Sequence, residues 1–188
     1  MPPKVKITKD EIISAALELL RREGETTVNA RSIAAALGCS TQPVFSNFAS
    51  MEELQSAVIN AAYAYYRSYL TEEMQGGKYH PYKAYGMAYI RFAREEKELF
   101  RALFMCDRKG QPLIPSPDFS ESVSMIMQAN GISREQAELW HMEMWSCVHG
   151  IGTMLATSFL DFDEQMISRM ISDIYQGLQT RHTQEVDT

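Results

Sequence analysis

Apolar residues recur at three- and four-residue steps along almost the whole of this 188-residue chain. That spacing places them on one face of an α-helix, whereas a half-buried β-strand requires apolar and polar residues to alternate. Such alternation is not sustained anywhere in the sequence. The sequence therefore predicts an all-α fold of about nine helices, with a three-helix N-terminal domain followed by a larger C-terminal helical bundle.

Capping residues and glycines divide the first fifty residues into three short helices. Pro43 is expected in the first turn of the third helix, where its missing N–H costs little. We expect Val44, Phe45 and Phe48 to anchor that helix to the first two. Because only three residues separate the second and third helices, they must cross as in a helix-turn-helix. The expected starts and stops are Thr8 to Gly24, Asn29 to Gly38, and Ser40 onward, the first with a capping box between Thr8 and Glu11.

The remainder of the chain is expected to hold six further helices. The fourth opens with the capping box Ser50-x-x-Glu53 and runs to about Tyr69. Breaks are expected at residues 74–81, which contain Gly76-Gly77 and Pro81, and at residues 110–117, which contain three prolines. We expect two domains, residues 1–50 and residues 51–188. The other predicted helices span residues 82–96, 97–106, 118–129, 133–159 and 162–180.

The third helix has the side chains needed to read a major groove. Gln42 and Asn47 can offer bidentate hydrogen bonds to adenine, each worth roughly 1–3 kcal/mol of discrimination. Thr41 and Ser46 add short polar groups, and Arg31 suits a phosphate. The alternative is that these helices are an ordinary bundle fragment whose polar residues face water.

The segment from Asn29 to Leu54 closely resembles the DNA-binding domain of the TetR family, and the resemblance extends over about residues 8–55. It implies that this part of the chain binds double-stranded DNA. The family often has Tyr where Phe45 stands and Lys where Met51 stands, and both commonly touch phosphate. Without these two side chains, other residues would have to supply more of the contacts to the DNA phosphate backbone. The expected DNA contacts are Lys6, Thr27, Arg31, Thr41, Gln42, Pro43, Phe45, Ser46 and Asn47.

Charge is divided unevenly along the chain, whose formal net charge is −6. Residues 1–50 carry six Lys or Arg side chains and five Asp or Glu side chains, whereas residues 51–188 carry twelve and nineteen. Lys4, Lys6 and Lys9 crowd an N-terminal arm that can lie along phosphates. The overall acidity therefore does not argue against nucleic-acid binding by the N-terminal part.

In the C-terminal half, the segment from Trp145 to Gly150 resembles a Trp-x-x-x-His-Gly signature of one class of TetR-type C-terminal domain. The last predicted helix carries an apolar stripe, and the helix before it carries small residues that allow close approach. Following the family's usual mode, the last two helices would form a four-helix homodimer interface. The stripe can equally belong to an internal core. Its residues are Met166, Ile167, Met170, Ile171, Ile174 and Leu178.

A small-molecule cavity would be lined by aromatic and Met residues of the central helices, although an ordinary core uses the same residue types. His149 is either a satisfied core histidine or a polar contact for an effector. Cys147 and His149 point in opposite directions on a helix, so they do not form a catalytic pair. The four histidines show no metal-binding spacing, and we expect no cofactor. The candidate cavity residues are Tyr85, Tyr89, Phe92, Phe104, Met142, Trp145 and His149.

These features together predict a ligand-responsive transcription regulator, a repressor that an effector releases from a palindromic operator. A helical enzyme is the alternative from another class, but the sequence has no G-x-S-x-G, H-E-x-x-H, P-loop or G-x-G-x-x-G motif. A regulator controlled by a protein partner is a third possibility. Three cysteines without a paired spacing, no apolar N-terminal leader and no run of eighteen apolar residues favour the cytoplasm.

Overall fold

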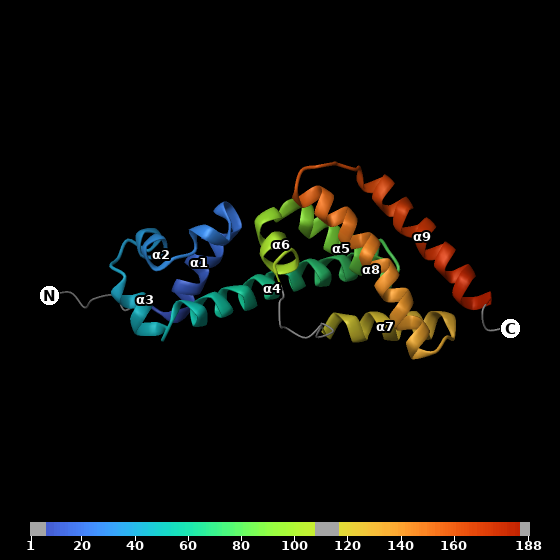
Figure 1. Ribbon diagram of the computed structural model, residues 1–188, viewed down its shortest axis with the longest axis horizontal. Helices are drawn as coiled ribbons and strands as arrows, with labels where there is room; N and C mark the ends of the chain where they lie inside the picture. Colours follow the sequence, from blue (N-terminus) through green and yellow to red (C-terminus); the bar gives the residue numbers. More distant parts are fainter. Residues whose placement is uncertain (1–6, 108–116, 185–188) are drawn as a thin grey trace. The chain divides into compact units, whose positions relative to one another are not determined.

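The computed structural model describes residues 7–107 and 117–184, and within these ranges the chain is all-helical (Figure 1). Nine α-helices and one short 3-10 helix, η1, account for its regular structure. In chain order they are α1 (Lys9–Glu23), η1 (Glu25–Thr27), α2 (Ala30–Ala36), α3 (Gln42–Asn47), α4 (Met51–Gly76), α5 (Pro81–Glu95), α6 (Lys97–Phe104), α7 (Pro117–Asn130), α8 (Arg134–Ala156) and α9 (Glu164–Gln184).

The helices form two compact units that are each built from two stretches of chain. The first unit comprises Met1–Arg67 and Glu96–Cys106, and the second comprises Ser68–Glu95 and Asp107–Thr188. This division differs from the expected boundary after residue 50. The first part of α4 and the whole of α6 belong with α1, α2 and α3, and α6 packs directly against α1.

Local capping signals explain how the first helices begin. Thr8 and Glu11 form the predicted capping box, with the Glu11 carboxylate accepting from the Thr8 N–H and the Thr8 hydroxyl accepting from the Glu11 N–H. The Asn29 side chain caps α2 by accepting from the N–H groups of Arg31 and Ser32. These bonds satisfy amides that a helix start otherwise leaves unpaired.

Two glycines end the helices as predicted. Gly24 follows α1 with φ +85°, and a Cβ at this position would lie 2.9 Å from the Glu98 carboxylate oxygen. Gly38 follows α2 with φ +63°, a left-handed conformation that side chains disfavour. Both positions therefore require glycine for the chain to reverse direction.

Other local expectations need correction. The N-cap of α3 is Thr41 rather than Ser40, and no side chain caps this helix. At α4, Ser50 accepts from the Glu53 N–H as predicted, but the Glu53 carboxylate accepts from the N–H of Ala49 instead of completing the box.

Helix α4 is longer than expected, since it continues past Tyr69 to Gly76. No residue between these positions favours a stop, and the predicted break at Gly76-Gly77 and Pro81 is where the helix ends and α5 begins. The expected loop at residues 110–117 lies outside the described residues, except that Pro117 opens α7.

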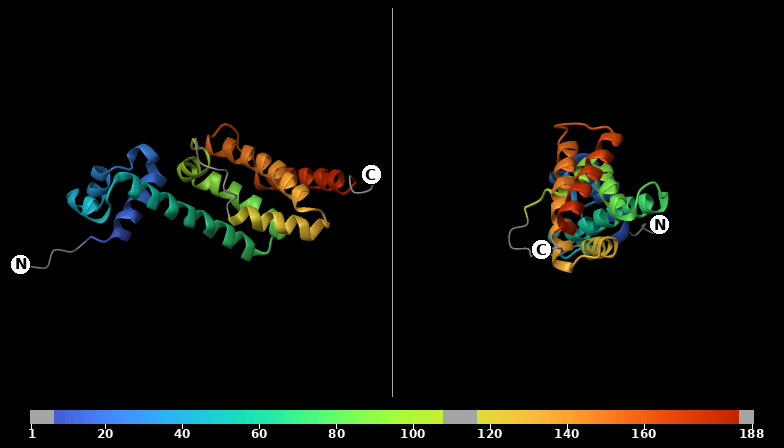
Figure 2. Two further views of the ribbon diagram at one scale, coloured as in Figure 1. Left: turned by 60° about the horizontal axis from the view of Figure 1, so that its bottom comes forward. Right: turned by 90° about the vertical axis from the view of Figure 1, so that its right-hand side faces the viewer.

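The core of the second unit surrounds α5, which contacts α7, α8 and α9. Helices α8 and α9 run side by side in opposite directions (Figures 1 and 2). Ile167 and Ile171 of α9 are buried in this core, whereas Met166 of the same stripe is 49% exposed. The stripe on α9 therefore belongs partly to the internal core and leaves Met166 outside it.

Candidate nucleic-acid interface and effector site

Helix α3 has one face that holds it to the first unit. Val44 and Phe48 are 1% and 2% exposed, and Phe48 also lies under the Lys9 ammonium group at 4.5 Å. The Asn47 side-chain nitrogen donates to the carbonyl oxygens of Pro43 at 2.8 Å and Ile7 at 3.4 Å. These contacts fix the orientation of α3 on the bundle and engage the amide N–H groups of Asn47 in structural bonds.

The opposite face of α3 is exposed and carries Gln42, Phe45 and Ser46. Phe45 was expected to anchor the helix, but its side chain is 58% exposed and stands one turn after Gln42. The Ser46 hydroxyl donates to the Gln42 carbonyl oxygen at 2.8 Å, so its proton is used within the helix. Gln42 and Phe45 are left as the larger side chains of the exposed face.

The other expected DNA contacts lie in different settings. Arg31 is exposed on the first turn of α2, and Thr41 and Pro43 are partly buried beside the start of α3. The half-buried Thr27 donates its hydroxyl proton to the Gly24 carbonyl oxygen at 2.7 Å. Lys6 lies outside the described residues.

Lys9 departs from its expected place in a free N-terminal arm. It is the first residue of α1, and its ammonium group lies 2.8 Å from the Glu53 carboxylate. This bond lowers the pKa of Glu53. Lys9 therefore fastens α1 to the start of α4.

A buried carboxylate ties α6 to α1 in the first unit, and sequence reasoning missed it. Glu96, which is 4% exposed, accepts from Nε and Nη2 of Arg21, each at 2.6 Å. The Tyr65 hydroxyl of α4 donates to the same carboxylate at 3.3 Å. Glu96 in turn raises the pKa of the Arg21 guanidinium group. Glu95 and Glu96 are neighbours in the sequence, but only Glu96 is buried. No local sequence pattern indicates which of the two faces inward.

Three of the expected cavity residues come together in the second unit. The hydroxyl of Tyr89, on α5, lies 2.8 Å from Nδ1 of His149, on α8. The ring of Trp145 stacks on His149 with centroids 4.8 Å apart and an interplanar angle of 11°. Burial lowers the pKa of His149, which favours the neutral imidazole at neutral pH. This group, Tyr89, Trp145 and His149, is called the α5/α8 triad below.

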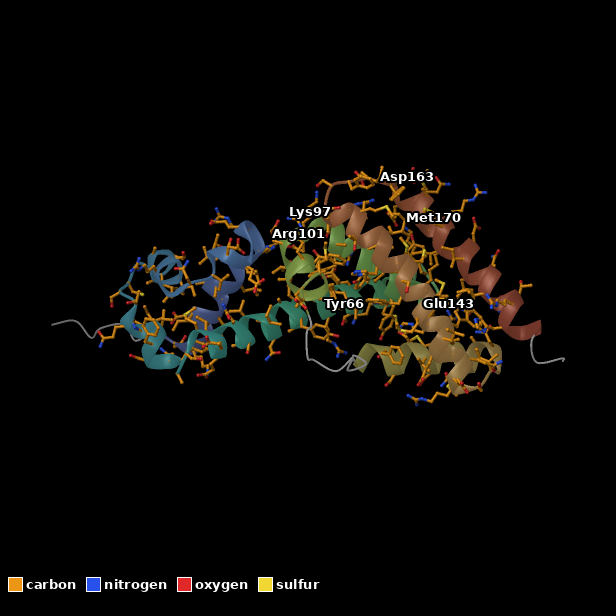
Figure 3. All side chains as sticks on the ribbon, viewed as in Figure 1. Tyr66, Lys97, Arg101, Glu143, Asp163 and Met170 are labelled. Atoms are coloured by element: carbon orange, nitrogen blue, oxygen red, sulfur yellow. The ribbon has the colours of Figure 1, made fainter. Side chains whose placement is uncertain are left out.

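The remaining expected cavity residues lie in other settings. Phe92 is fully buried and packs edge-on against Tyr69 at 5.2 Å. Met142 is 40% exposed on α8, and Tyr85 is half-buried on α5. Phe104 belongs to the first unit, where the centroid of its ring lies 5.2 Å from that of Tyr66 on α4 (Figure 3). Phe104 therefore packs within the first unit, and its place in an effector cavity stays a prediction.

A second aromatic cluster in the same unit was not anticipated. His141 of α8 packs edge-on against Phe119 and its Nδ1 lies 3.1 Å from the Tyr82 hydroxyl. Trp140, which is fully buried, stacks on His182 at 5.5 Å, and His182 Nε2 lies 3.0 Å from the carboxylate of Glu143, labelled in Figure 3. The adjacent Trp140 and His141 on an apolar helix were the sequence feature that could have indicated this cluster.

We expect His141 to make stability fall as the pH falls from 7 to 5. Burial lowers its pKa to about 4, from an ordinary value of 6.5. Below pH 6.5 the His141 ring is protonated in the unfolded chain but stays neutral in the folded protein. The free energy of unfolding therefore decreases as the pH falls from 6.5 to 4. Integration over this window gives a loss of roughly 1–2 kcal/mol by pH 5. Urea unfolding at both pH values measures it.

The variant His141→Asn should lose the part of this pH dependence that His141 supplies, and a remainder is expected from His149, whose pKa burial also lowers. His80→Asn, at an exposed histidine, should retain the full dependence. An unchanged pH slope in His141→Asn would show that another group is responsible. Carboxylates with lowered pKa values, such as Glu11 and Glu164, contribute chiefly below this window.

His149 Nδ1 faces Tyr89, and burial raises the pKa of the Cys147 thiol, which disfavours a thiolate nucleophile. No group of three or more His, Cys, Asp or Glu side chains in residues 7–107 and 117–184 is arranged to hold a metal ion. Within the same ranges, no helix combines the length and apolar character needed to span a bilayer.

No model of a protein family matches the sequence, and no curated protein matches it. Among solved structures, the fold matches "Crystal structure of multidrug binding protein EbrR complexed with imidazole" with a TM-score of 0.56 and 14% sequence identity. The match covers 88% of this chain and 93% of that chain. Over the residues that the structure describes, the chain therefore has the all-helical, TetR-like fold that the sequence predicts.

Proposed function

We propose that the chain is a ligand-responsive, sequence-specific DNA-binding transcription regulator. The observation that carries this proposal is the exposed face of α3, with Gln42 and Phe45 pointing away from a bundle that Val44 and Phe48 hold rigidly. A helix presented in this way after a short turn has the geometry of a recognition helix in a major groove. We assign phosphate contacts to Arg31, which is exposed on the first turn of α2, and to Thr41, the N-cap residue of α3.

We propose that residues 1–50 read the DNA sequence and that residues 51–188 sense the effector and form the dimer. EbrR is described as a multidrug binding protein and was crystallised with imidazole. By analogy, the effector here is a small molecule, and the α5/α8 triad supplies aromatic surface with a neutral imidazole beside a phenol. We propose that effector binding lowers operator affinity, because the effector prefers one of two states of the protein. We also propose that the protein acts as a repressor.

Dimerisation is proposed through the outer surfaces of α8 and α9. Leu139, Met142 and Trp145 stand at three-residue steps on α8 and are 56%, 40% and 40% exposed. Met166 adds 49% exposed apolar surface from α9. A two-fold dimer would present two copies of α3 to half-sites roughly 34–36 Å apart, which makes the operator a palindrome.

Selection from a pool of random duplex DNA at moderate salt tests the function directly. We expect the bound fraction to yield a palindrome, and Gln42→Ala to weaken binding and relax the preference at one base pair per half-site. A bidentate amide contact discriminates by roughly 1–3 kcal/mol, or about 5- to 150-fold. Competition binding against single-base operator variants measures this.

The matched control is Gln128→Ala, at an exposed glutamine of α7 in the second unit. It should leave affinity and sequence preference unchanged. Recovery of no motif, with only weak salt-sensitive binding, would remove the proposed function and leave regulation through a protein partner as the alternative. A palindrome read equally well by wild type and Gln42→Ala would refute the assignment of Gln42 alone.

A further inference from the structure

Phe45 has an environment that a structural role does not explain. Of the large apolar side chains in the described part of the first unit, only Phe45 and Met105 are prominently exposed, and Phe45 is the aromatic one. It stands one turn from Gln42 on the outer face of α3, while Val44 and Phe48 supply the packing. Its ring therefore contributes little to holding the helix.

The neighbours of Phe45 have most of their polar groups engaged. The Ser46 proton is donated to the Gln42 carbonyl oxygen, and Asn47 donates to the carbonyl oxygens of Pro43 and Ile7. The side-chain N–H donors that α3 still offers outward are thus those of Gln42, and beside them stands one hydrocarbon ring, at Phe45. A benzyl side chain cannot hydrogen-bond a phosphate, which leaves apolar contact as its means of recognition.

We propose that Phe45 is a specificity-determining residue that recognises the 5-methyl group of thymine in each operator half-site. This inference rests on the proposed DNA-reading function. The thymine methyl is the apolar feature that a base pair presents in the major groove, and aromatic carbon is a suitable partner for it. With Gln42 placed to pair with adenine one helical turn away, the centre of each half-site is expected to be rich in A·T pairs.

Replacing single thymines of the selected operator by deoxyuridine tests this proposal, because it removes the methyl group and keeps Watson–Crick pairing. Burial of one methyl group corresponds to about a fourfold change in affinity, so the wild type should lose about fourfold per substituted half-site at one thymine position. Substitution of both half-sites should cost about fifteenfold. Fluorescence anisotropy with labelled duplexes measures these values.

The variant Phe45→Ala should bind the thymine and deoxyuridine operators equally, whereas Gln42→Ala should keep the methyl dependence of the wild type. Phe45→Leu should keep part of it, since the side chain remains apolar. A wild type indifferent to every deoxyuridine substitution would overturn the inference while leaving the regulator function intact. Retention of the full methyl dependence by Phe45→Ala would also overturn it. Failure to select any operator would remove the proposed function and this inference with it.

Discussion

Replacing Met142 by glutamate is expected to abolish self-association and to lower operator affinity by about 10²- to 10⁴-fold, the range that linking two binding events contributes. Met142 lies between Leu139 and Trp145 on the exposed apolar face of α8, so a two-fold interface would bring two carboxylates into an apolar contact. Because Met142 is 40% exposed in the subunit, the fold should survive the change. Analytical ultracentrifugation and operator titration measure the two effects.

Gln128→Glu introduces the same side chain at an exposed position of α7 and should leave both properties unchanged. Circular dichroism should show equal helix content in the two variants. The dimer proposal would be refuted if the wild type sediments as a monomer at micromolar concentration, or if Met142→Glu remains a dimer with full operator affinity.

Replacing Arg21 by alanine is expected to destabilise the protein by roughly 2–3 kcal/mol. The change leaves the Glu96 carboxylate, which is 4% exposed, without its bidentate partner. Breaking a fully buried pair costs about 3–5 kcal/mol, and the smaller figure here reflects an Arg21 side chain that is 44% exposed. The Tyr65 hydroxyl remains as a donor to Glu96. Urea unfolding should show a midpoint about 1 M lower.

The control for this experiment is Glu18→Gln, which removes a second, exposed neighbour of Arg21 at 3.8 Å. It should change stability by less than about 0.5 kcal/mol, as exposed ion pairs generally do. The double variant Arg21→Ala, Glu96→Gln should recover part of the lost stability because no buried charge is left unpaired. Equal effects of Arg21→Ala and Glu18→Gln would show that the Glu96 pair does not matter.

Signals confined to a few neighbouring residues were sufficient to predict much of the fold. The capping box of Thr8 and Glu11, the Asn29 cap and the glycines after α1 and α2 act through backbone groups close in sequence, so their outcome follows from local chemistry. The apolar periodicity of nine segments likewise depends on each helix alone. Helix order and class were therefore predictable, with errors mainly at the ends.

Features that depend on which helices pack together were not predictable. Phe45 and Phe48 look alike as aromatic neighbours of a short helix, yet one is 58% exposed and the other 2%. Phe104 resembles the aromatic residues of the second unit but lies in the first, because α6 packs on α1. The sequence also does not show that Glu96 rather than Glu95 faces Arg21. Each outcome is decided by tertiary contacts that no local pattern encodes.

The first unit is built from two separate stretches of chain, and this limits how it can be fused to other proteins. A chimera that carries only residues 1–67 would lack α6, with the apolar face of α1 and the guanidinium of Arg21 deprived of their partners. A transplanted first unit must include Glu96–Cys106, which is separated in the chain from Arg67 by the end of α4 and by α5, both in the second unit. Exchange of modules in this architecture therefore requires a graft at two places in the chain, not a single cut.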